Sequence, residues 1–421
     1  MELNRRKLLL GGAAAATALP FALRSAPAAA EGAVDPGSFD PESPLPHKDA
    51  FFSFTGSYLD SGSQHPLSRG ARASIERYLD YKTMAGDSGF QPYATRQRVL
   101  DSYARLINAS PEEISFVPST TAGENLVVQA LGLPDSGGRI VTDALHFFGS
   151  FPMYAELGKR GMDVVTLRPR AGRIDLEELE QAVTPGTRLV SISSVSTFNG
   201  FEHDLAAVCE IAHRQGALVY ADAIHSVGAV PFDVCATGVD FCSASAYKWL
   251  MADMGLGFLY VRADRLGDLA RPWYGYHQIA SFQSHVYPGD PEGEAVADYT
   301  YAESASGYFA MGTLANAVAA ELDYSLGYLL EVGVERIQRY RQPLLDRLQE
   351  ALPALGYPSL TPPGSRSALA SFQCSDARQV LPPRFEAAGV TVTTGRNHFR
   401  VSPSVFNDMD DIERLLEALR S

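Results

Sequence analysis

The chain has 421 residues, a formal net charge of −14 and an apolar share of 46%, a composition typical of globular proteins with two or three hydrophobic cores. The negative charge argues against nucleic acid and anionic lipid as partners, since both carry charge of the same sign. The four cysteines show no CxxC pair and the nine histidines no HExxH motif, so the sequence predicts no metal site.

The N-terminal segment has the three parts of a cleavable export signal. Three basic residues, 5–7, precede an apolar stretch, 8–23, and three alanines, 28–30, close it. The paired arginines resemble a twin-arginine signal, and the apolar stretch is short for a transmembrane helix. We therefore expect residues 1–30 to be a signal peptide and the protein to be periplasmic or secreted, without membrane contact beyond this signal.

Beyond an N-terminal arm (31–60), short apolar runs alternate with helical patterns. Strands are predicted at 114–117, 139–142, 164–167, 188–196, 216–223, 239–245 and 257–261, with helices at 122–131 and 205–215. This alternation predicts an α/β fold with a parallel or mixed, doubly wound sheet. A Tyr- and His-rich connection, 273–310, follows, and then a long helix. We expect a large domain over 61–310 and a smaller C-terminal α+β domain over 311–421.

Polar residues at the ends of these strands are the candidates for a site, because open parallel sheets bind ligands there. Asp222 ends the run "LVYAD", and His225 lies three residues later. Lys248 follows another strand, with Ser245 three residues before it. The run Ser119-Thr120-Thr121 opens a helix, where hydroxyls and free N–H groups suit a phosphate.

Each of these residues alone is explained as well by a cap, a turn or a structural hydrogen bond. Together they supply a carboxylate for a pyridine nitrogen, a lysine for a Schiff base and a phosphate cradle. That set is what pyridoxal phosphate requires.

Six segments in chain order resemble the class V aminotransferases of pyridoxal-phosphate fold type I, a superfamily that includes cysteine desulfurases, kynureninases and isopenicillin N epimerases. They are "YLDSGS" (58–63), "STTAGENLV" (119–127), "DAIHSVGAVPFDV" (222–234), "SAYKW" (245–249), "MGT" (311–313) and "FRVSPSVFNDMDDIERLLEAL" (399–419). The resemblance implies a large domain with a mixed, mostly parallel seven-stranded sheet, a smaller C-terminal domain, and pyridoxal 5'-phosphate as cofactor.

The resemblance also implies roles for the matching residues. Lys248 would carry the cofactor, and Asp222 would pair with its pyridine nitrogen. His225 would hydrogen-bond the ring hydroxyl, and His146 would stack on the ring. The residues that would hold the phosphate are Thr120, Thr121 and Ser245, with Thr313 reaching from the neighbouring subunit of a homodimer.

Arg400 would bind the α-carboxylate of the substrate through its bidentate fork. Arg396, on the same loop, would add a second grip on an acidic substrate, although a solvated arginine explains it equally well. Two positions depart from the family pattern. Tyr247 replaces the histidine that desulfurases place before the lysine, and Thr197 replaces an asparagine beside the ring oxygen, which leaves that contact open.

The segment "TVTTGRNHFR" (391–400) contains no cysteine where desulfurases carry their nucleophile. We therefore expect an aminotransferase and not a cysteine desulfurase, acting on a small-molecule or peptide-derived amino substrate. The export signal makes the chain similar to periplasmic aminotransferases that modify pyoverdine-type siderophores. An amino-acid epimerase like isopenicillin N epimerase, a C–S or C–Se lyase, and a non-catalytic cofactor-binding protein are the alternatives.

Overall fold

The structure is a computed structural model that describes residues 40–420 except 41, 53 and 85. The predicted signal peptide (1–30) and residues 31–39, 41 and 53 of the predicted arm lie outside these residues. The described residues divide into two compact units, of which one contains residues 280–301 and the other contains the remaining described residues. Among the described helices, none combines the length and apolar composition needed to cross a bilayer.

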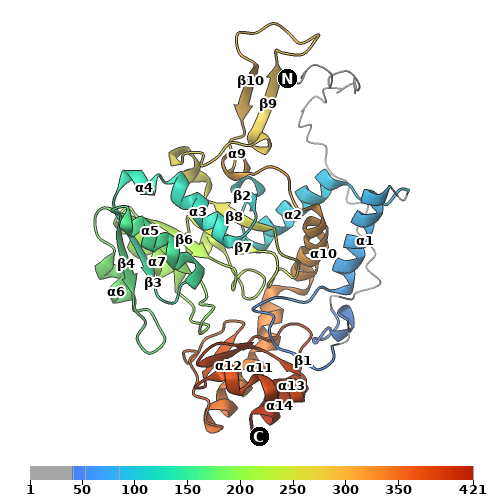
Figure 1. The fold of residues 1–421 in the computed structure, drawn as a ribbon, viewed down its shortest axis with the longest axis vertical. Helices are drawn as coiled ribbons and strands as arrows, with labels where there is room; N and C mark the ends of the chain where they lie inside the picture. Colours follow the sequence, from blue (N-terminus) through green and yellow to red (C-terminus); the bar gives the residue numbers. More distant parts are fainter. Residues whose placement is uncertain (1–39, 41, 53, 85, 421) are drawn as a thin grey trace, which may run out of the picture. The chain divides into compact units, whose positions relative to one another are not determined.

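The larger unit is built on a seven-stranded sheet with the order β2-β8-β7-β6-β5-β3-β4 (Figure 1). All neighbours run parallel except β8, which is antiparallel to both β2 and β7. The strands are β2 (Ile114–Val117), β3 (Arg139–Asp143), β4 (Asp163–Leu167), β5 (Thr187–Ser193), β6 (Leu218–Asp222), β7 (Phe241–Ser245) and β8 (Gly257–Val261). The predicted α/β class and the mixed, mostly parallel sheet are confirmed.

The strands are apolar on both sides because helices cover both faces of the sheet. Along β6, Val219 and Ala221 belong to one core, whereas Tyr220 between them belongs to another. This alternation is the two-residue period of a strand whose two faces are both buried. The first core also contains side chains of α2 (Pro92–Ile107), α7 (Leu205–Arg214) and α10 (Asn316–Val332). The second contains side chains of α3 (Thr120–Ala130) and α5 (Phe151–Lys159).

Further helices and turns precede the C-terminal part of this unit. They are α1 (Arg69–Thr83), α4 (Leu133–Ser136), α6 (Leu176–Ala182), α8 (Val234–Thr237) and α9 (Ala305–Phe309), with the 3-10 turns Lys48–Ala50, Pro111–Glu113, Phe148–Ser150, Ala263–Asp268 and Tyr276–Gln278.

The C-terminal part has a third core around a three-stranded antiparallel sheet of order β11-β14-β13. Its elements are α11 (Val334–Ala354), β11 (Ala370–Gln373), α12 (Ala377–Val380), α13 (Pro382–Ala388), β12 (Val390–Thr391), β13 (Thr393–Thr394), β14 (His398–Val401) and α14 (Met409–Arg420). The short strand β1 (Ser57–Tyr58) pairs in parallel with β12. A parallel bridge between Asp60 and Ser402 then brings the segment after Tyr58 to the end of β14, the strand that carries Arg400.

Residues 280–301 form the other unit, a two-stranded sheet of β9 (Ile279–Ser284) and β10 (Ala297–Tyr301) (Figure 1). The Ser281 and Thr300 hydroxyls are hydrogen-bonded at 2.6 Å across the two strands. Phe282 and Tyr299 on these strands are exposed. The sequence predicted only a connection here, because the runs are short and their large side chains are not periodic enough to separate strand from loop.

Candidate active site

The site lies where the parallel strands β6 and β7 end side by side. Asp222, the last residue of β6, is in register with Ser243 of β7. Ser245 ends β7, and the turn that follows carries Lys248. The sequence placed Asp222, Ser245 and Lys248 at strand ends, and the topology brings these ends together at one edge of the sheet.

Lys248 is buried, with 7% of its surface exposed, and its Nζ lies 3.0 Å from His225 Nε2. Burial and the nearby charge of Arg400 lower the pKa of Lys248 to about 7, against the opposing effect of Asp222 and Asp60. Near neutral pH, a large fraction of the molecules therefore has Lys248 as a neutral amine. A neutral amine can attack a carbonyl and can accept a proton.

His225 is enclosed by three partners. Its Nε2 lies 3.1 Å from Thr197 Oγ1 as well as 3.0 Å from Lys248, and its Nδ1 accepts a hydrogen bond of 3.2 Å from the Trp249 indole. Burial and the charges of Lys248 and Arg400 hold its pKa well below the ordinary value. His225 is therefore a neutral imidazole at the centre of the site.

Asp222 is a buried carboxylate that can pair with a cation. Its Oδ1 accepts a hydrogen bond of 3.0 Å from the Ile224 N–H. Burial raises the pKa of Asp222, although the charge of His146 and this hydrogen bond oppose the shift. A protonated ring nitrogen beside Asp222 would relieve the cost of burying its charge.

Thr120 and Ser245 meet at the start of α3. The Thr120 N–H donates to Ser245 Oγ at 3.0 Å, and the N-cap Ser119 accepts from the Ala122 N–H at 3.2 Å. The helix packs closely on β7, because a Cβ on Gly123 would lie 2.2 Å from Ser243 Oγ. The Ser245 hydroxyl keeps its own proton to donate, and the start of an 11-residue helix favours an anion.

Two other predicted phosphate ligands are less closely tied to this cradle. Thr121 is exposed on the first turn of α3, and Thr313 is exposed just before α10. No contact among the described residues joins Thr313 to Thr120 or Ser245. Its role across a subunit boundary stays a prediction.

His146 is held by a buried network that the sequence did not reveal. Its Nε2 lies 2.9 Å from Glu124 Oε1, and its Nδ1 lies 2.8 Å from Ser193 Oγ. Burial alone would lower the pKa of His146, but the Glu124 carboxylate outweighs it and raises this pKa. Both ring nitrogens are engaged, which leaves the face of the ring for the expected stacking role.

Arg400 on β14 lies in a cluster of hydroxyls. Its Nη1 donates to the Thr197 carbonyl at 3.1 Å and to Thr197 Oγ1 at 2.8 Å. Its Nη2 donates to Ser63 at 2.6 Å and to Thr393 at 3.0 Å. Asp60 Oδ1 lies 3.6 Å from Nη2. The four Nη–H groups are all used by these neutral partners, whereas the buried Nε–H has no hydrogen-bond partner among the described residues. A substrate carboxylate could therefore bind at Nε–H and take the place of a neutral partner at Nη.

Arg396, the second predicted carboxylate ligand, is exposed on the turn before β14. No contact among the described residues joins it to Arg400 or to Lys248. The structure thus brings one of the two predicted arginines to the site.

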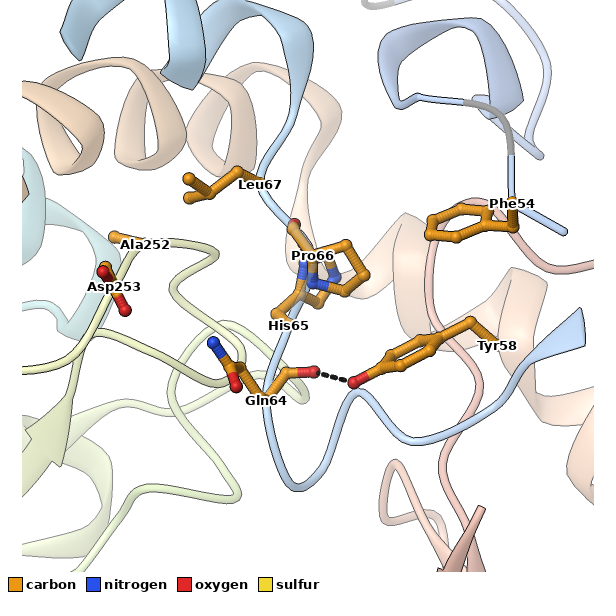
Figure 2. A pocket seen from close by; sticks show the side chains of 8 residues that line it. All are labelled: Phe54, Tyr58, Gln64, His65, Pro66, Leu67, Ala252 and Asp253. Atoms are coloured by element: carbon orange, nitrogen blue, oxygen red, sulfur yellow. Dashed lines mark hydrogen bonds between the residues drawn. The ribbon is translucent and has the colours of Figure 1, made fainter. Parts of the chain in front are cut away.

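A separate pocket of about 410 Å³ borders the segment that leads to Ser63 (Figure 2). Its lining consists of Phe54, Tyr58, Gln64, His65, Pro66, Leu67, Ala252 and Asp253. The Tyr58 hydroxyl donates to the Gln64 carbonyl at 2.7 Å, and the His65 N–H donates to the Tyr247 carbonyl at 2.9 Å. The segment 58–65 therefore connects this pocket to both the Arg400 cluster and the residue before Lys248.

The donor set fits pyridoxal phosphate. It contains a buried amine of lowered pKa, a buried carboxylate, a neutral imidazole and a hydroxyl-lined helix start. The amine can bond to the cofactor's aldehyde and the carboxylate can pair with its ring nitrogen. The start of the helix can bind its phosphate. The fold and the site together define an enzyme of the pyridoxal-phosphate fold type I.

Comparisons with known proteins give the family. Residues 84–415 match the model of the family described as aminotransferase class-V. The chain is 28% identical over 349 residues to a probable cysteine desulfurase of Methanothermobacter thermautotrophicus, across 81% of this chain and 84% of that relative. The chain belongs to the class V aminotransferase family, whose cofactor is pyridoxal phosphate, so the predicted family and cofactor are confirmed.

Solved structures share the fold. The cysteine desulfurase CsdA of Escherichia coli aligns with a TM-score of 0.77 and 20% identity over 91% of this chain and 98% of that chain. A structure of C-DES, in which glycine is covalently linked to the pyridoxal phosphate cofactor, aligns with a TM-score of 0.74 and 20% identity over 87% of this chain and 97% of that chain.

The expectation of an aminotransferase that is not a cysteine desulfurase is wrong, because relatives that match most of the chain are cysteine desulfurases. The expectation rested on the missing cysteine in residues 391–400. β-Elimination breaks the C–S bond with the cofactor and the base alone, and in desulfuration an added thiol can attack the sulfur in place of that cysteine. Its absence from one loop therefore does not exclude this chemistry.

Several residues of the site were missed by reasoning from the sequence. They are Asp60, Ser63, Glu124, Trp249 and Thr393. Glu124 carried a usable signal, because it is a lone acid in the apolar helix pattern "TTAGENLVV". Asp60, Ser63 and Trp249 lie in the segments "YLDSGS" and "SAYKW" that carry the resemblance, but they received no role from the sequence because their partners are distant in the chain. Thr393 carries no local signal.

Proposed function

We propose that the protein is a pyridoxal-phosphate enzyme that cleaves the C–S bond of a cysteine-type amino acid. The observation that carries the proposal is a chain of contacts, Lys248–His225–Thr197–Arg400, with steps of 3.0, 3.1 and 2.8 Å. It connects a base to a carboxylate-binding arginine through one imidazole and one hydroxyl. The cysteine desulfurases among the relatives supply the reaction class.

Each residue has a task in this reaction. Pyridoxal phosphate, when bound, withdraws electrons from the Cα of an amino acid and so eases bond breaking at Cα and Cβ. Arg400 would hold the α-carboxylate through its unpartnered Nε–H and through one Nη–H that gives up its present partner. Lys248, with a pKa of about 7, accepts the Cα proton at its Nζ. Asp222 balances the positive charge of a ring nitrogen.

The acceptor of the sulfur is a separate question. Cys209 and Cys242 are buried, and burial raises the pKa of the Cys209 thiol to about 12. Cys235 on α8 is exposed, and its Sγ donates to the Asn108 carbonyl at the end of α2 at 3.2 Å, not to a residue of the site. Cys374 follows β11, and its N–H donates to the Asn397 carbonyl at 3.1 Å, near β14. Burial also raises the pKa of Cys374, which makes its reactive thiolate scarce. We therefore propose one of two routes for the sulfur. An external thiol attacks it and becomes a persulfide, while Cβ takes a proton and the product is alanine; or the sulfur leaves Cβ as sulfide with the bonding electrons, and hydrolysis gives pyruvate and ammonia.

The test is to incubate the holoenzyme with L-cysteine and a small thiol and to quantify alanine, pyruvate, ammonia and sulfide. Formation of alanine, with sulfide released when excess thiol reduces the persulfide, indicates desulfuration. Formation of pyruvate, ammonia and sulfide indicates elimination. Either result supports C–S cleavage, and Lys248→Ala should abolish it. A Cys374→Ser variant that keeps the rate supports the external acceptor.

The same experiment separates the alternatives that the sequence left open. If no sulfide forms while an amino donor yields its keto product, amino-group transfer replaces the proposal. A peptide-derived donor should be included in that arm. If both enantiomers of an added amino acid appear instead, the enzyme is an epimerase.

We also propose that the protein is exported and acts as a homodimer. The basic, apolar and small-residue parts of residues 1–30 support export. Fusion of these residues to a reporter that is active only outside the cytoplasm should give signal, and replacement of Arg5 and Arg6 by lysine should remove it. A reporter that remains inactive with the unaltered segment contradicts export.

A further inference from the structure

Trp249 directly follows Lys248 in the chain, and its side chain contacts the second ring nitrogen of His225, Nδ1. The residue is 1% exposed, and its Nε1 lies 3.2 Å from His225 Nδ1. An indole nitrogen can only donate a hydrogen bond. His225 Nδ1 must therefore be the acceptor, and a neutral His225 must carry its proton on Nε2.

The proton on Nε2 has a direct consequence for Lys248. Nε2 faces Lys248 Nζ at 3.0 Å and Thr197 Oγ1 at 3.1 Å. An ammonium group has donors only, so Lys248 can accept from Nε2–H only as a neutral amine. The Nε2–H form of His225 thus disfavours the charged form of its neighbour.

Other groups also face Lys248. The charge of Arg400 opposes an ammonium, whereas the carboxylates of Asp222 and Asp60 favour it. The ring of Tyr247 lies 5.8 Å from Nζ. Among these neighbours, His225 is the group whose effect can change sign, because its two tautomers present either a donor or an acceptor.

The surroundings hold the indole in place. A Cβ on Gly228, which has φ +81°, would lie 2.6 Å from the Trp249 carbonyl oxygen, so the backbones pack closely there. The buried guanidinium of Arg341 lies 5.3 Å from the indole ring centroid. A cation over the ring draws electron density from it, which makes the indole N–H a better donor.

We propose that Trp249 is a positioning residue that fixes His225 as the Nε2–H tautomer and thereby keeps Lys248 a neutral amine. The proposal concerns the step in which Lys248 bonds to the cofactor. It holds for whichever bond the enzyme then breaks, so it does not depend on C–S chemistry.

The test compares Trp249→Phe with Trp273→Phe in the full chain. Trp273 is a matched control, because its indole also donates one hydrogen bond, of 3.1 Å, to the Phe309 carbonyl outside this cluster. Nitrogen-15 NMR of labelled histidines should show His225 with its proton on Nε2 in the unaltered protein and in Trp273→Phe. Trp249→Phe should add a population with the proton on Nδ1.

A second readout follows Lys248 itself. The pH dependence of its bonding to added pyridoxal phosphate, seen by absorbance, reports the pKa of the amine. Trp249→Phe should raise this pKa by about one pH unit, the scale of one hydrogen bond to a charged group. The shift should vanish in a His225→Gln background, where no tautomer exists.

Three results would overturn the proposal. The first is a charged or Nδ1–H His225 in the unaltered protein, which requires no variant to fold. The second is Trp249→Phe with an unchanged tautomer, and the third is an equal pKa shift in the His225→Gln background.

Discussion

Lys248 shows how surroundings convert a common surface residue into a reactive one. Burial and Arg400 lower its pKa to about 7, so lowering the pH below 7 protonates the amine. We expect the rate at which pyridoxal phosphate bonds to the cofactor-free protein to fall steeply below pH 7 and to level off above it. Stopped-flow absorbance across this range measures the rate.

The identity of the lysine can be tested directly. Borohydride reduction of the holoenzyme followed by peptide mass spectrometry should locate the cofactor on Lys248, and Lys248→Ala should remove the reducible bond. A label on any other lysine would show that the assignment is wrong.

Arg400 is expected to bind the substrate carboxylate through its planar fork, which lysine cannot reproduce. Arg400→Lys should therefore weaken capture of L-cysteine by about 2–5 kcal/mol, measured as kcat/KM, if the pair is buried. Arg396→Lys is the matched control, because Arg396 is exposed and reaches no residue of the site. An unchanged kcat/KM for Arg400→Lys would show that Arg400 does not bind the carboxylate. A large loss of kcat/KM for Arg396→Lys would support the prediction that Arg396 also binds an acidic substrate.

At the scale of an element, α3 has two tasks. Its first turn carries the predicted phosphate ligands, and Glu124 in its second turn accepts hydrogen bonds from His146, Ser150, Tyr154 and Ser191. Burial alone would raise the pKa of Glu124, but the charge of His146 and these hydrogen bonds lower it to about 2. The helix therefore ties the cradle to the ring of His146.

This network predicts a specific pH dependence of stability. The pKa of His146 is raised by folding, so its contribution is fully present below the unfolded value of 6.5 and is lost as the pH rises through the folded value. Glu124→Gln removes the charge that raises this pKa. The pKa of Glu124 is lowered by folding, so its own contribution is full only above its unfolded value of 4.5. We expect the substitution to lower the free energy of unfolding by about 3–5 kcal/mol between pH 4.5 and 6.5, and by less at lower or higher pH.

Chemical denaturation of the cofactor-free protein at several pH values measures this effect. Glu156→Gln on α5 is the control, since Glu156 forms an exposed pair with Lys159. It should change stability by less than about 0.5 kcal/mol at each pH. Equal effects of the two substitutions would contradict the role of Glu124.

At the scale of the whole molecule, the site is expected to be shared between two subunits. If Thr313 reaches the phosphate of a neighbouring subunit, Thr313→Asp should place a negative charge beside that phosphate and inactivate the neighbour. Light scattering should report a dimer. A stable monomer with full activity would contradict the expectation.

Mixed dimers give a sharper test of the same expectation. In a dimer of Lys248→Ala with Thr313→Asp subunits, one site combines both defects, and the other has an intact Lys248 and an intact Thr313. Mixing the two inactive proteins should therefore restore activity. If Thr313 served its own subunit, mixing would restore none.

The sequence by itself determined the strands of the sheet and the positions of Asp222, Ser245 and Lys248 at their ends. These features are local, because a strand buried on both faces is a short apolar run, and the residue after it lies at the edge of the sheet. The family and the cofactor followed from six short motifs in order.

Only the tertiary structure decided which distant residues meet. Thr197 and Arg400 are 203 positions apart, yet the pairing of β1 with β12 and of β13 with β14 brings Asp60, Ser63 and Thr393 around the same guanidinium. The directions of the Glu124 and Trp249 side chains were equally hidden, since a lone acid or indole in an apolar pattern does not say which neighbour it will face. Hydrogen bonds between such residues depend on the packing of the whole chain, which no local pattern encodes.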